Sequence, residues 1–478
     1  MMGRQDQQKE LFSYRIDLDQ RVRGDNPLRK VAAAIDFSWV RGEVESTYGY
    51  NGNVSVDPVV ILKLMFLLFF DNVPSERQLL EIVPERLDYL WFLGLGLNDP
   101  VPHHSVLSKA RARWGSALFE KLFLRTVGAC VSAGLVDGQK IHIDGSLIAA
   151  HAANPSLVEG PPELIAALRQ VYQEQAAKLT ETAPVPAPCG AANQTHVSTT
   201  DPDAELARKR NTPSRLSYKH HRVVDDAAGV ITAQCTTGGS QAEDRQLFGL
   251  VQKHELNTGV LVATAVADAQ YGTAANLLAC ADRGIRPHLA DLQSAQGRRA
   301  RPGALFAPDQ FVYDPATDTY QCPAGQALRR YQRRSDKAAW EYKAARTACA
   351  HCALRAQCTT SKRGRRVLRL ERQEDVDRLR RVANSPAAKK DRRRRMHLME
   401  GSFADATNCH GFKRARWRRL WRQKIQNHLI AACQNVRILI KNRRGGPTAA
   451  ISSQSLAHLD SWVPAKWVLL TNQPWSLN

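Results

Sequence analysis

The segment Lys140-Ile141-His142-Ile143-Asp144 alternates apolar and polar side chains, as a half-buried β-strand does. Its two isoleucines would share the buried face, and its aspartate would close the strand. Strand patterns resume at residues 216–224 and 230–236 on either side of a polar turn, which predicts a hairpin. A continuously apolar stretch, residues 259–266, is typical of a central strand covered on both faces. These patterns predict an α/β fold with a mixed sheet.

Helical patterns lie before and after this sheet region. Asp57 is a good N-cap ahead of Pro58, and the apolar residues that follow predict a helix over residues 58–70. A second helix is predicted over residues 392–406. A long amphipathic helix is predicted over residues 416–441, because its apolar side chains recur every three or four positions.

The net charge of the chain points to its partner. The sequence has 67 Lys and Arg against 46 Asp and Glu, a net charge of +21. A surface this basic attracts polyanions and gains free energy from counterion release, although ribosomal and RNA-binding proteins share that property. The longest apolar run, residues 59–70, is well short of the ~20 residues of a membrane span. Residues 1–10 have no apolar segment typical of a signal peptide. We expect a cytoplasmic protein without a membrane partner.

Three acidic residues occupy positions from which they could converge. Asp144 follows the first strand, Asp268 follows the apolar strand, and Glu400 lies on a predicted helix at the edge of its apolar stripe. Three carboxylates that meet without a basic partner repel one another. Two Mg²⁺ (or Mn²⁺) ions would relieve that repulsion and activate an attacking oxygen. The arrangement predicts phosphoryl-transfer chemistry with these three acids as metal ligands.

Each acid also has a simpler structural interpretation. Asp-Gly is a common hairpin-turn dipeptide, so Asp144 could form a turn with Gly145. Asp268 could cap the following helix, although Thr273 is the better-placed N-cap. Glu400 could be an ordinary solvated glutamate. Only the combination of the three favours a catalytic site.

Four of the ten cysteines cluster within 37 residues of sequence, at Cys322, Cys349, Cys352 and Cys358. Four thiolates at this spacing suit a tetrahedral Zn²⁺, which could hold together a loop-rich region that lacks a large core. His351 is a substitute ligand, but its place between two cysteines makes simultaneous use awkward. The alternative is four unrelated thiols.

Basic residues gather in three places where they could follow a DNA backbone. One set lies on a predicted helix within residues 102–114, one leads into the helix that carries Glu400, and one follows that helix. The residues predicted to contact DNA are Lys109, Arg111, Arg113, Arg392, Arg393, Arg394, Arg395, Lys413, Arg414 and Arg416. The alternative is a solvated charged face.

Several segments resemble bacterial insertion-sequence transposases of the DDE type. Residues 141–146, Ile-His-Ile-Asp-Gly-Ser, resemble the first-aspartate motif of that family, and residues 266–272 resemble the second. Residues 400–406 resemble the glutamate block of one such group, and Gln-Asn-Val at residues 434–436 is similar to the end of its terminal helix. The similarity runs in the family's order over residues 10–442.

The resemblance implies a fold and a reaction. The fold would be an RNase H-like mixed sheet with flanking helices, preceded by an all-helical N-terminal domain and interrupted by a Cys/Arg-rich insertion. Water would cut the ends of the element, and the freed 3′-hydroxyl would attack target DNA. Asp144, Asp268 and Glu400 would be the metal-binding triad. The partners would be double-stranded DNA, as terminal inverted repeats and target, bound by a nucleoid-associated homodimer.

The sequence departs from many related transposases at three positions. Those proteins place Tyr seven and Arg four residues before the glutamate and Lys seven after it. The corresponding residues here are Arg393, Met396 and Thr407. The phosphate-gripping role would then pass to neighbouring basic residues, or the activity would be weakened. Two other functions stay open: a non-catalytic nucleic-acid-binding protein derived from a transposase, and an RNase H-like nuclease without strand transfer.

The expected domain organisation follows the same motifs. It comprises a helical N-terminal DNA-binding domain (1–135), the first part of the catalytic core (136–291) with a helix and linker insertion (154–213), a Cys/Arg-rich insertion with the zinc site (292–390), the C-terminal helices of the core (391–445) and a tail (446–478).

Overall fold

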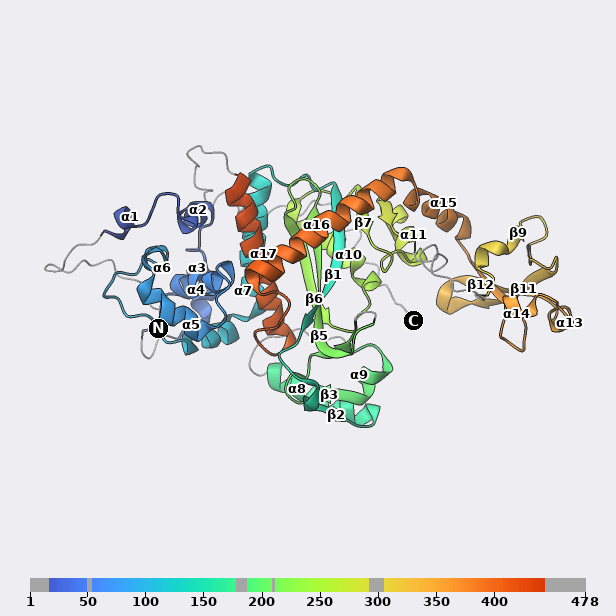
Figure 1. Ribbon diagram of the computed structural model, residues 1–478, viewed down its shortest axis with the longest axis horizontal. Helices are drawn as coiled ribbons and strands as arrows, with labels where there is room; N and C mark the ends of the chain where they lie inside the picture. Colours follow the sequence, from blue (N-terminus) through green and yellow to red (C-terminus); the bar gives the residue numbers. More distant parts are fainter. Residues whose placement is uncertain (1–16, 50–53, 178–186, 209–210, 292–304, 443–478) are drawn as a thin grey trace. The chain divides into compact units, whose positions relative to one another are not determined.

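The computed structural model describes five ranges of the chain: residues 17–49, 54–177, 187–208, 211–291 and 305–442 (Figure 1). The expected tail lies outside these ranges. The described residues form two compact units. The first contains the described residues up to 268 and those from 390 to 442, and the second contains those from 269 to 389.

The first unit begins with a set of helices. They are α1 (Leu18–Arg21), α2 (Pro27–Ala34), α3 (Val40–Val44), α4 (Pro58–Phe70), α5 (Glu76–Ile82), α6 (Leu87–Leu93) and α7 (Ser105–Ser132). The side chain of Asp57 accepts a hydrogen bond from the N–H of Val59 (2.8 Å), which confirms the predicted N-cap of α4. Nearly every residue of α4 is buried, so this helix forms the centre of the helical region. Helix α7 is kinked at Gly115, whose φ is +65°.

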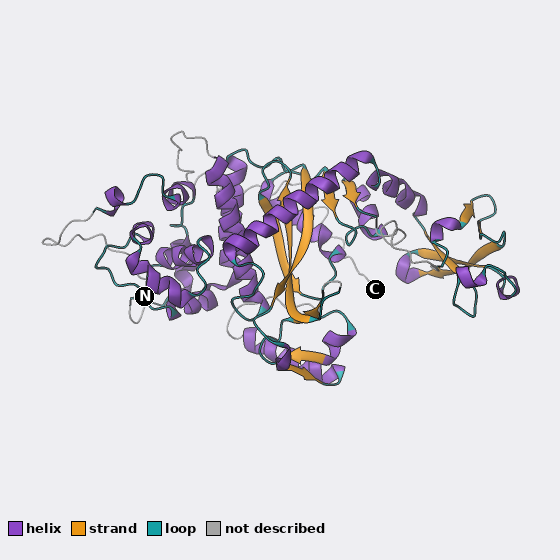
Figure 2. Cartoon of the chain, in the orientation of Figure 1, coloured by secondary structure: helices purple, strands orange, loops and turns teal. Residues whose placement is uncertain are grey.

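A mixed sheet follows the helices in the same unit (Figure 2). The strands that this unit contributes to the sheet are β1 (Lys140–Ala149), β4 (Glu205–Ala207), β5 (Arg215–Asp225), β6 (Ile231–Gly238) and β7 (Thr264–Ala267). Strand β5 pairs antiparallel with β4, with β6 and with β1, and β1 pairs parallel with β7. The β5–β6 pair confirms the predicted hairpin. Strand β1 therefore lies between an antiparallel and a parallel neighbour.

Long helices pack against this sheet. They are α10 (Leu247–Thr258), α16 (Pro386–His410) and α17 (Leu420–Asn442). Helix α17 contacts β6, α4 and α7, so its buried face joins the sheet to the helical region. A small lobe between β1 and β5 in the sequence contains β2 (Leu157–Glu159), β3 (His196–Ser198), α8 (Pro162–Ala177) and α9 (Ala191–Thr195).

The second unit has its own sheet. Helix α11 (Ala274–Asp282) and strand β8 (Arg286–Leu289) come first. The antiparallel sheet has the order β13-β12-β11-β10-β9 and consists of β9 (Val312–Asp314), β10 (Thr319–Gln321), β11 (Ala327–Arg334), β12 (Ala339–Lys343) and β13 (Arg366–Leu370). Three further helices are α13 (Arg346–Ala350), α14 (Arg355–Cys358) and α15 (Gln373–Ala383).

Two details of the predicted strands are wrong. Asp144 does not close its strand, because β1 continues to Ala149 and pairs with β5 along that length. The apolar stretch at residues 259–266 forms a strand only from Thr264 onward, since α10 extends to Thr258 and ends at Gly259 in the left-handed conformation (φ +72°). The coarse prediction, an α/β fold with a helical N-terminal region and a mixed sheet, is confirmed. No described helix is both long enough and apolar enough to cross a membrane.

Candidate functional site

Three carboxylates meet in the first unit. Asp144, Glu243 and Asp268 each offer one carboxylate oxygen, and these oxygens all lie within 4.8 Å of one another. All three residues are half-buried. Oxygen donors grouped in this way match the ligands that Mg²⁺ and Mn²⁺ prefer. Within the described parts of the chain, this trio is the group of acidic, histidine and cysteine side chains close enough to share an ion.

The parallel pairing of β1 with β7 brings the two aspartates together. His142 of β1 lies opposite Val266 of β7. Asp144 lies two residues further along β1, and Asp268 directly follows the end of β7. The parallel register of the two strands thus brings the aspartates to neighbouring positions.

Glu243 reaches the aspartates from the turn that follows β6. It stands directly before a short 3₁₀ helix, Asp244–Gln246. A Cβ atom on Gly145 would lie 3.3 Å from the carboxyl carbon of Glu243, so the glycine after Asp144 lets this side chain approach the backbone of β1. Glu243 was not among the predicted site residues, because it lies in a polar turn without a periodic pattern.

The pKa of Glu243 reflects its burial and the negative charges of the two aspartates beside it. Burial raises the pKa of its carboxyl, and the carboxylates of Asp268 and Asp144 raise it further. Lys219 of β5 opposes this shift, with its Nζ 3.4 Å from Oε1 of Glu243. The expectation that the acids meet without a basic partner is therefore wrong.

Helix α16 contributes a second basic partner. The Nη1 atom of Arg395 lies 2.9 Å from Oδ2 of Asp144, and its side chain is only 13% exposed. Glu400, on the same helix, is exposed and is not one of the three clustered acids. The apolar stripe predicted beside it is also incomplete, because Met399 is buried whereas Met396 is 52% exposed.

The basic residues predicted on α7 differ in exposure. Lys109 and Arg113 are exposed. Arg111 is 4% exposed, forms an ion pair with Glu76, and stacks 4.0 Å over the ring of Trp417. Burial lowers the pKa of Arg111 to about 9. In this conformation Arg111 has no exposed face for a phosphate, so it packs as part of the core.

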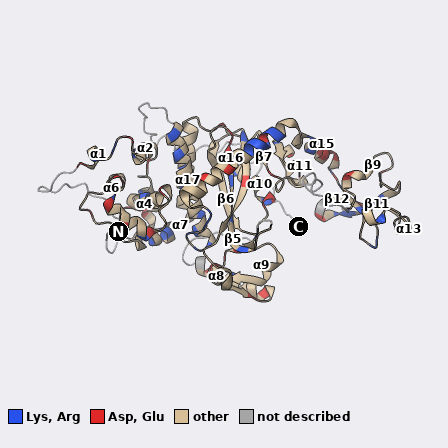
Figure 3. Cartoon of the chain, viewed as in Figure 1, with Lys and Arg blue, Asp and Glu red and all other residues tan. Residues whose placement is uncertain are grey.

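The four consecutive arginines, residues 392–395, lie in the N-terminal half of α16, the helix that carries Arg395 to the acid site (Figure 3). Arg393 is exposed and Arg392 is half-buried. Arg394 forms an ion pair with Asp226 and donates to its backbone carbonyl. Arg394 and Arg395 are therefore already bound to acidic groups, whereas Arg393 is exposed.

The segment after α16 extends the sheet. The N–H of Ala149 donates to the carbonyl of Lys413 (3.0 Å), and the N–H of Ala415 donates to the carbonyl of Ala149 (2.8 Å). This pairing brings Nζ of Lys413 within 2.6 Å of the Ser146 hydroxyl. Arg414 is exposed.

Arg416 has a structural role. Its guanidinium donates to the carbonyls of Leu68 (3.2 Å) and Val73 (2.6 Å) and to the side chain of Asn72 (2.8 Å). These groups lie at and just beyond the C-terminal end of α4, where helix carbonyls lack intrahelical partners. Burial lowers the pKa of Arg416 to about 10. Its donors are therefore used within the protein.

A buried arginine next to the site was not predicted. Arg222 lies opposite Asp144 on β5 and is fully buried. Its guanidinium donates to the Ser402 hydroxyl (2.8 Å) and to the Gln434 side chain (3.1 Å), and it stacks 4.3 Å over Phe403. Burial lowers its pKa to about 9. Arg222 thus connects β5 to α16 and α17 next to Asp144.

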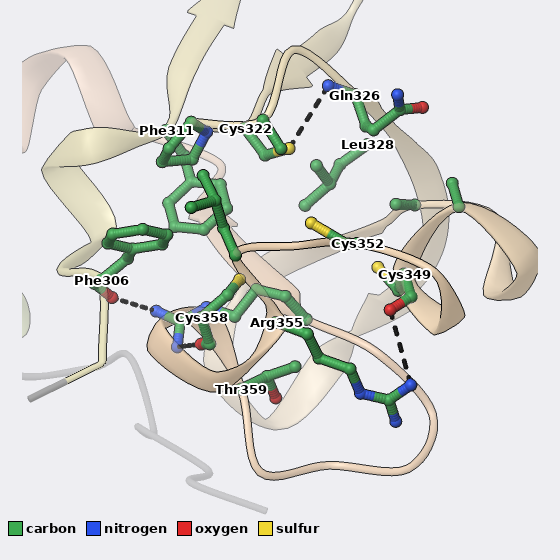
Figure 4. Close-up of a pocket in the computed structure, with 16 residues that line it drawn as sticks. Phe306, Phe311, Cys322, Gln326, Leu328, Cys349, Cys352, Arg355, Cys358 and Thr359 are labelled. Carbon is green, nitrogen blue, oxygen red and sulfur yellow. Dashed lines mark hydrogen bonds between the residues drawn. The ribbon is translucent and has the colours of Figure 1, made fainter. Parts of the chain in front are cut away.

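The four cysteines predicted to bind zinc line a single pocket in the second unit (Figure 4). They come from three separate segments of that unit. All four are half-buried free thiols. The pocket also contains apolar side chains, among them Phe306, Phe311 and Leu328.

The fold and the acid site together define a class: a mixed α/β protein with carboxylates gathered beside two adjacent parallel strands. Comparison with known families is more specific. The family described as Transposase domain (DUF772) matches residues 16–113, and the family described as Transposase DDE domain matches residues 321–440. These two matches support an insertion-sequence transposase of the DDE type, as the sequence motifs predicted. No curated protein matches the chain significantly.

Proposed function

We propose that the chain is a DNA transposase that binds the ends of an insertion sequence, cleaves them hydrolytically and joins the 3′-hydroxyl ends to target DNA. The observation that carries this proposal is the position of Asp144 on β1 beside Asp268, which directly follows the parallel strand β7, with Glu243 within ligand distance of both. The antiparallel β6-β5-β1 strands followed by the parallel β7 support an RNase H-like core. The transposase DDE family implies a DNA substrate and a divalent metal.

The donor set fits that metal, because it offers three hard oxygen ligands in a half-buried position. When bound, two Mg²⁺ ions would activate the attacking oxygen and stabilise the leaving one. Asp144 and Asp268 would hold the metal from the sheet. Lys413, 2.6 Å from Ser146 two residues after Asp144, would attract the DNA backbone to this edge.

The third carboxylate is where resemblance and geometry differ. The family resemblance gives this role to Glu400, which is exposed on α16. The distances favour Glu243, whose oxygen lies within 4.8 Å of those of both aspartates. We propose that Glu243 completes the metal site in the conformation described.

A cleavage and joining reaction tests the function. A labelled duplex that carries the candidate end of the element would be incubated with the protein, Mg²⁺ and target plasmid. We expect cut ends and joined product, and loss of both with Asp144→Asn or Asp268→Asn, while DNA binding is kept. Cutting without joining would support the nuclease alternative. DNA binding with no cutting by the wild type would support the non-catalytic alternative and overturn the proposal.

Metal binding gives a readout that does not depend on turnover. Mn²⁺ titrations followed by electron paramagnetic resonance would compare Glu243→Gln with Glu400→Gln in the absence of DNA. We expect Glu243→Gln to weaken Mn²⁺ binding about tenfold or more, which corresponds to about 1.4 kcal/mol, and Glu400→Gln to leave it unchanged. The reverse result would return the third ligand to Glu400.

We further propose that the protein acts as a homodimer on DNA, with one end of the element bound by each protomer, and that it is associated with the nucleoid. Light scattering of the complex with one end duplex would show two chains. A complex with a single chain that still joins ends would overturn the dimer.

A further inference from the structure

The β9–β13 sheet of the second unit has a small hydrophobic core. The sheet packs around six buried residues, Phe311, Tyr320, Leu328, Tyr342, Ala344 and Val367. Cys322, Cys349 and Cys358 pack at the edge of the same cluster. Small regions with so little buried apolar surface usually depend on an additional cross-link, such as a disulfide or a metal ion.

Cys322 begins a tight turn between β10 and β11. The N–H of Gly325 donates to the carbonyl of Cys322 (2.8 Å), and Gly325 adopts φ +74°, which the turn requires. The N–H of Gln326 points at the sulfur, 3.3 Å from Sγ of Cys322 (Figure 4). A backbone N–H aimed at the sulfur is a contact that would orient and support a cysteine ligand once a metal is bound.

The other three cysteines lie in two short helices and in the turn that joins them. Cys349 lies in α13, Cys352 follows that helix by two residues, and Cys358 ends α14. A Cβ atom on Gly364, which has φ +85°, would lie 3.1 Å from Sγ of Cys349, so the loop before β13 also packs against this sulfur. The cysteines thus join the β10–β11 turn, both helices and the loop to β13 at one place.

We propose that Cys322, Cys349, Cys352 and Cys358 bind one Zn²⁺, which holds the sheet and the short helices of the second unit together. The pocket is lined mainly by apolar side chains and contains four thiols, the donor set that Zn²⁺ prefers in structural sites. The four sulfurs do not meet the 4.8 Å spacing that the three clustered carboxylates meet. They must therefore move together when the ion binds, and metal binding should make this unit more compact.

Metal analysis of the full-length protein tests this proposal. Protein purified without metal-affinity steps, and then incubated with ZnCl₂ and desalted, should contain one zinc per chain. Cys352→Ser should lose it. Cys409→Ser, a half-buried cysteine outside the pocket, and Asp144→Asn, in the acid site, should each keep it. Zinc lost from Asp144→Asn but kept by Cys352→Ser would place the ion at the carboxylates and overturn the proposal.

Two further measurements cover the case in which Cys352→Ser fails to fold. Wild-type protein loaded with Co²⁺ should show the intense thiolate-to-metal absorption of a tetrahedral sulfur site. Removal of zinc by a chelator should then increase protease cleavage within residues 305–389, and added Zn²⁺ should reverse it. Reduced wild-type protein that takes up no zinc, or that has the same protease pattern with and without it, would overturn the proposal.

Discussion

Arg395 holds its guanidinium 2.9 Å from the carboxylate of Asp144, so α16 places a positive charge where a metal ligand is proposed. A cation that binds Asp144 must compete with this arginine. Because removal of a nearby positive charge favours a second cation, Arg395→Gln should tighten Mn²⁺ binding several-fold in the absence of DNA. Arg23→Gln, far more exposed, is the control and should have no effect. Equal affinities of Arg395→Gln and wild type would contradict the competition.

The open basic residues should determine the salt dependence of DNA binding. Arg393, Lys109 and Arg113 are exposed. Each phosphate contact makes the negative slope of log K against log salt steeper by about 0.9. We therefore expect Arg393→Gln, Lys109→Gln and Arg113→Gln each to make the slope shallower by about one, with similar losses on unrelated DNA sequences. Binding titrations at several salt concentrations measure this, and unchanged slopes would assign these residues to a solvated face.

Replacing all four arginines at residues 392–395 should make the slope of log K against log salt shallower by less than four, the value expected if each arginine contacted one phosphate. Arg394 and Arg395 are already paired with Asp226 and Asp144, so their loss removes ion pairs within the protein as well as phosphate contacts. The quadruple change of residues 392–395 to glutamine should therefore make the slope shallower by about one to two. It should also reduce cleavage more than binding. A slope shallower by four would show that DNA displaces both internal pairs.

The buried Asp201 should make stability depend on pH. Burial raises its pKa to about 6, although Tyr218 donates a hydrogen bond to it (2.7 Å). Because the folded state binds this proton more tightly than the unfolded chain, the contribution of Asp201 is greatest below about pH 4 and is lost as the pH rises through 6. The loss is at most about 3 kcal/mol. Asp201→Asn should remove this pH dependence. The free energy of unfolding of the variant, measured by urea denaturation, should therefore rise relative to that of wild type between pH 4.5 and 7.5. A constant difference would contradict the raised pKa.

Asn435 should be difficult to replace. Its side chain accepts a hydrogen bond from the N–H of Ile231 (2.9 Å) and donates one to the carbonyl of the same residue (2.8 Å). Asn435→Leu would leave both buried backbone groups unpaired, at an expected cost of about 2–5 kcal/mol in the free energy of unfolding. Asn442→Ala, at the exposed end of the same helix, is the control and should cost little. Denaturant unfolding compares the two.

Local patterns were sufficient for much of the fold. The N-cap at Asp57, the β5–β6 hairpin and the apolar face of α17 each depend on neighbours in the sequence, and the structure confirms them. Thr273 likewise caps α11, because its side chain accepts a hydrogen bond from the N–H of Asn276. Such elements are set by residues a few positions apart, so the sequence displays them directly.

The site was harder to predict because its geometry is long-range. Glu243 and Asp144 are about a hundred positions apart, and only the packing of the turn after β6 against Gly145 brings them together. Arg111 appeared to be one charge in a basic helix, but Glu76, 35 residues earlier, provides its partner. No periodicity records such pairs. The sequence indicated which acids could act, and the folded arrangement added Glu243.

The place of Asp144 within β1 makes the chain sensitive to insertions and deletions at that point. The strand is paired on both sides at His142, and successive side chains point to opposite faces. One residue added between Lys140 and Asp144 would turn the carboxylate away from Asp268 and bury it among apolar groups, or it would break the ladder with β5 or with β7. Loops elsewhere can change length through evolution at little cost. The segment of β1 from Lys140 to Asp144 cannot change length in this way, so its number of residues should stay fixed even where its side chains change.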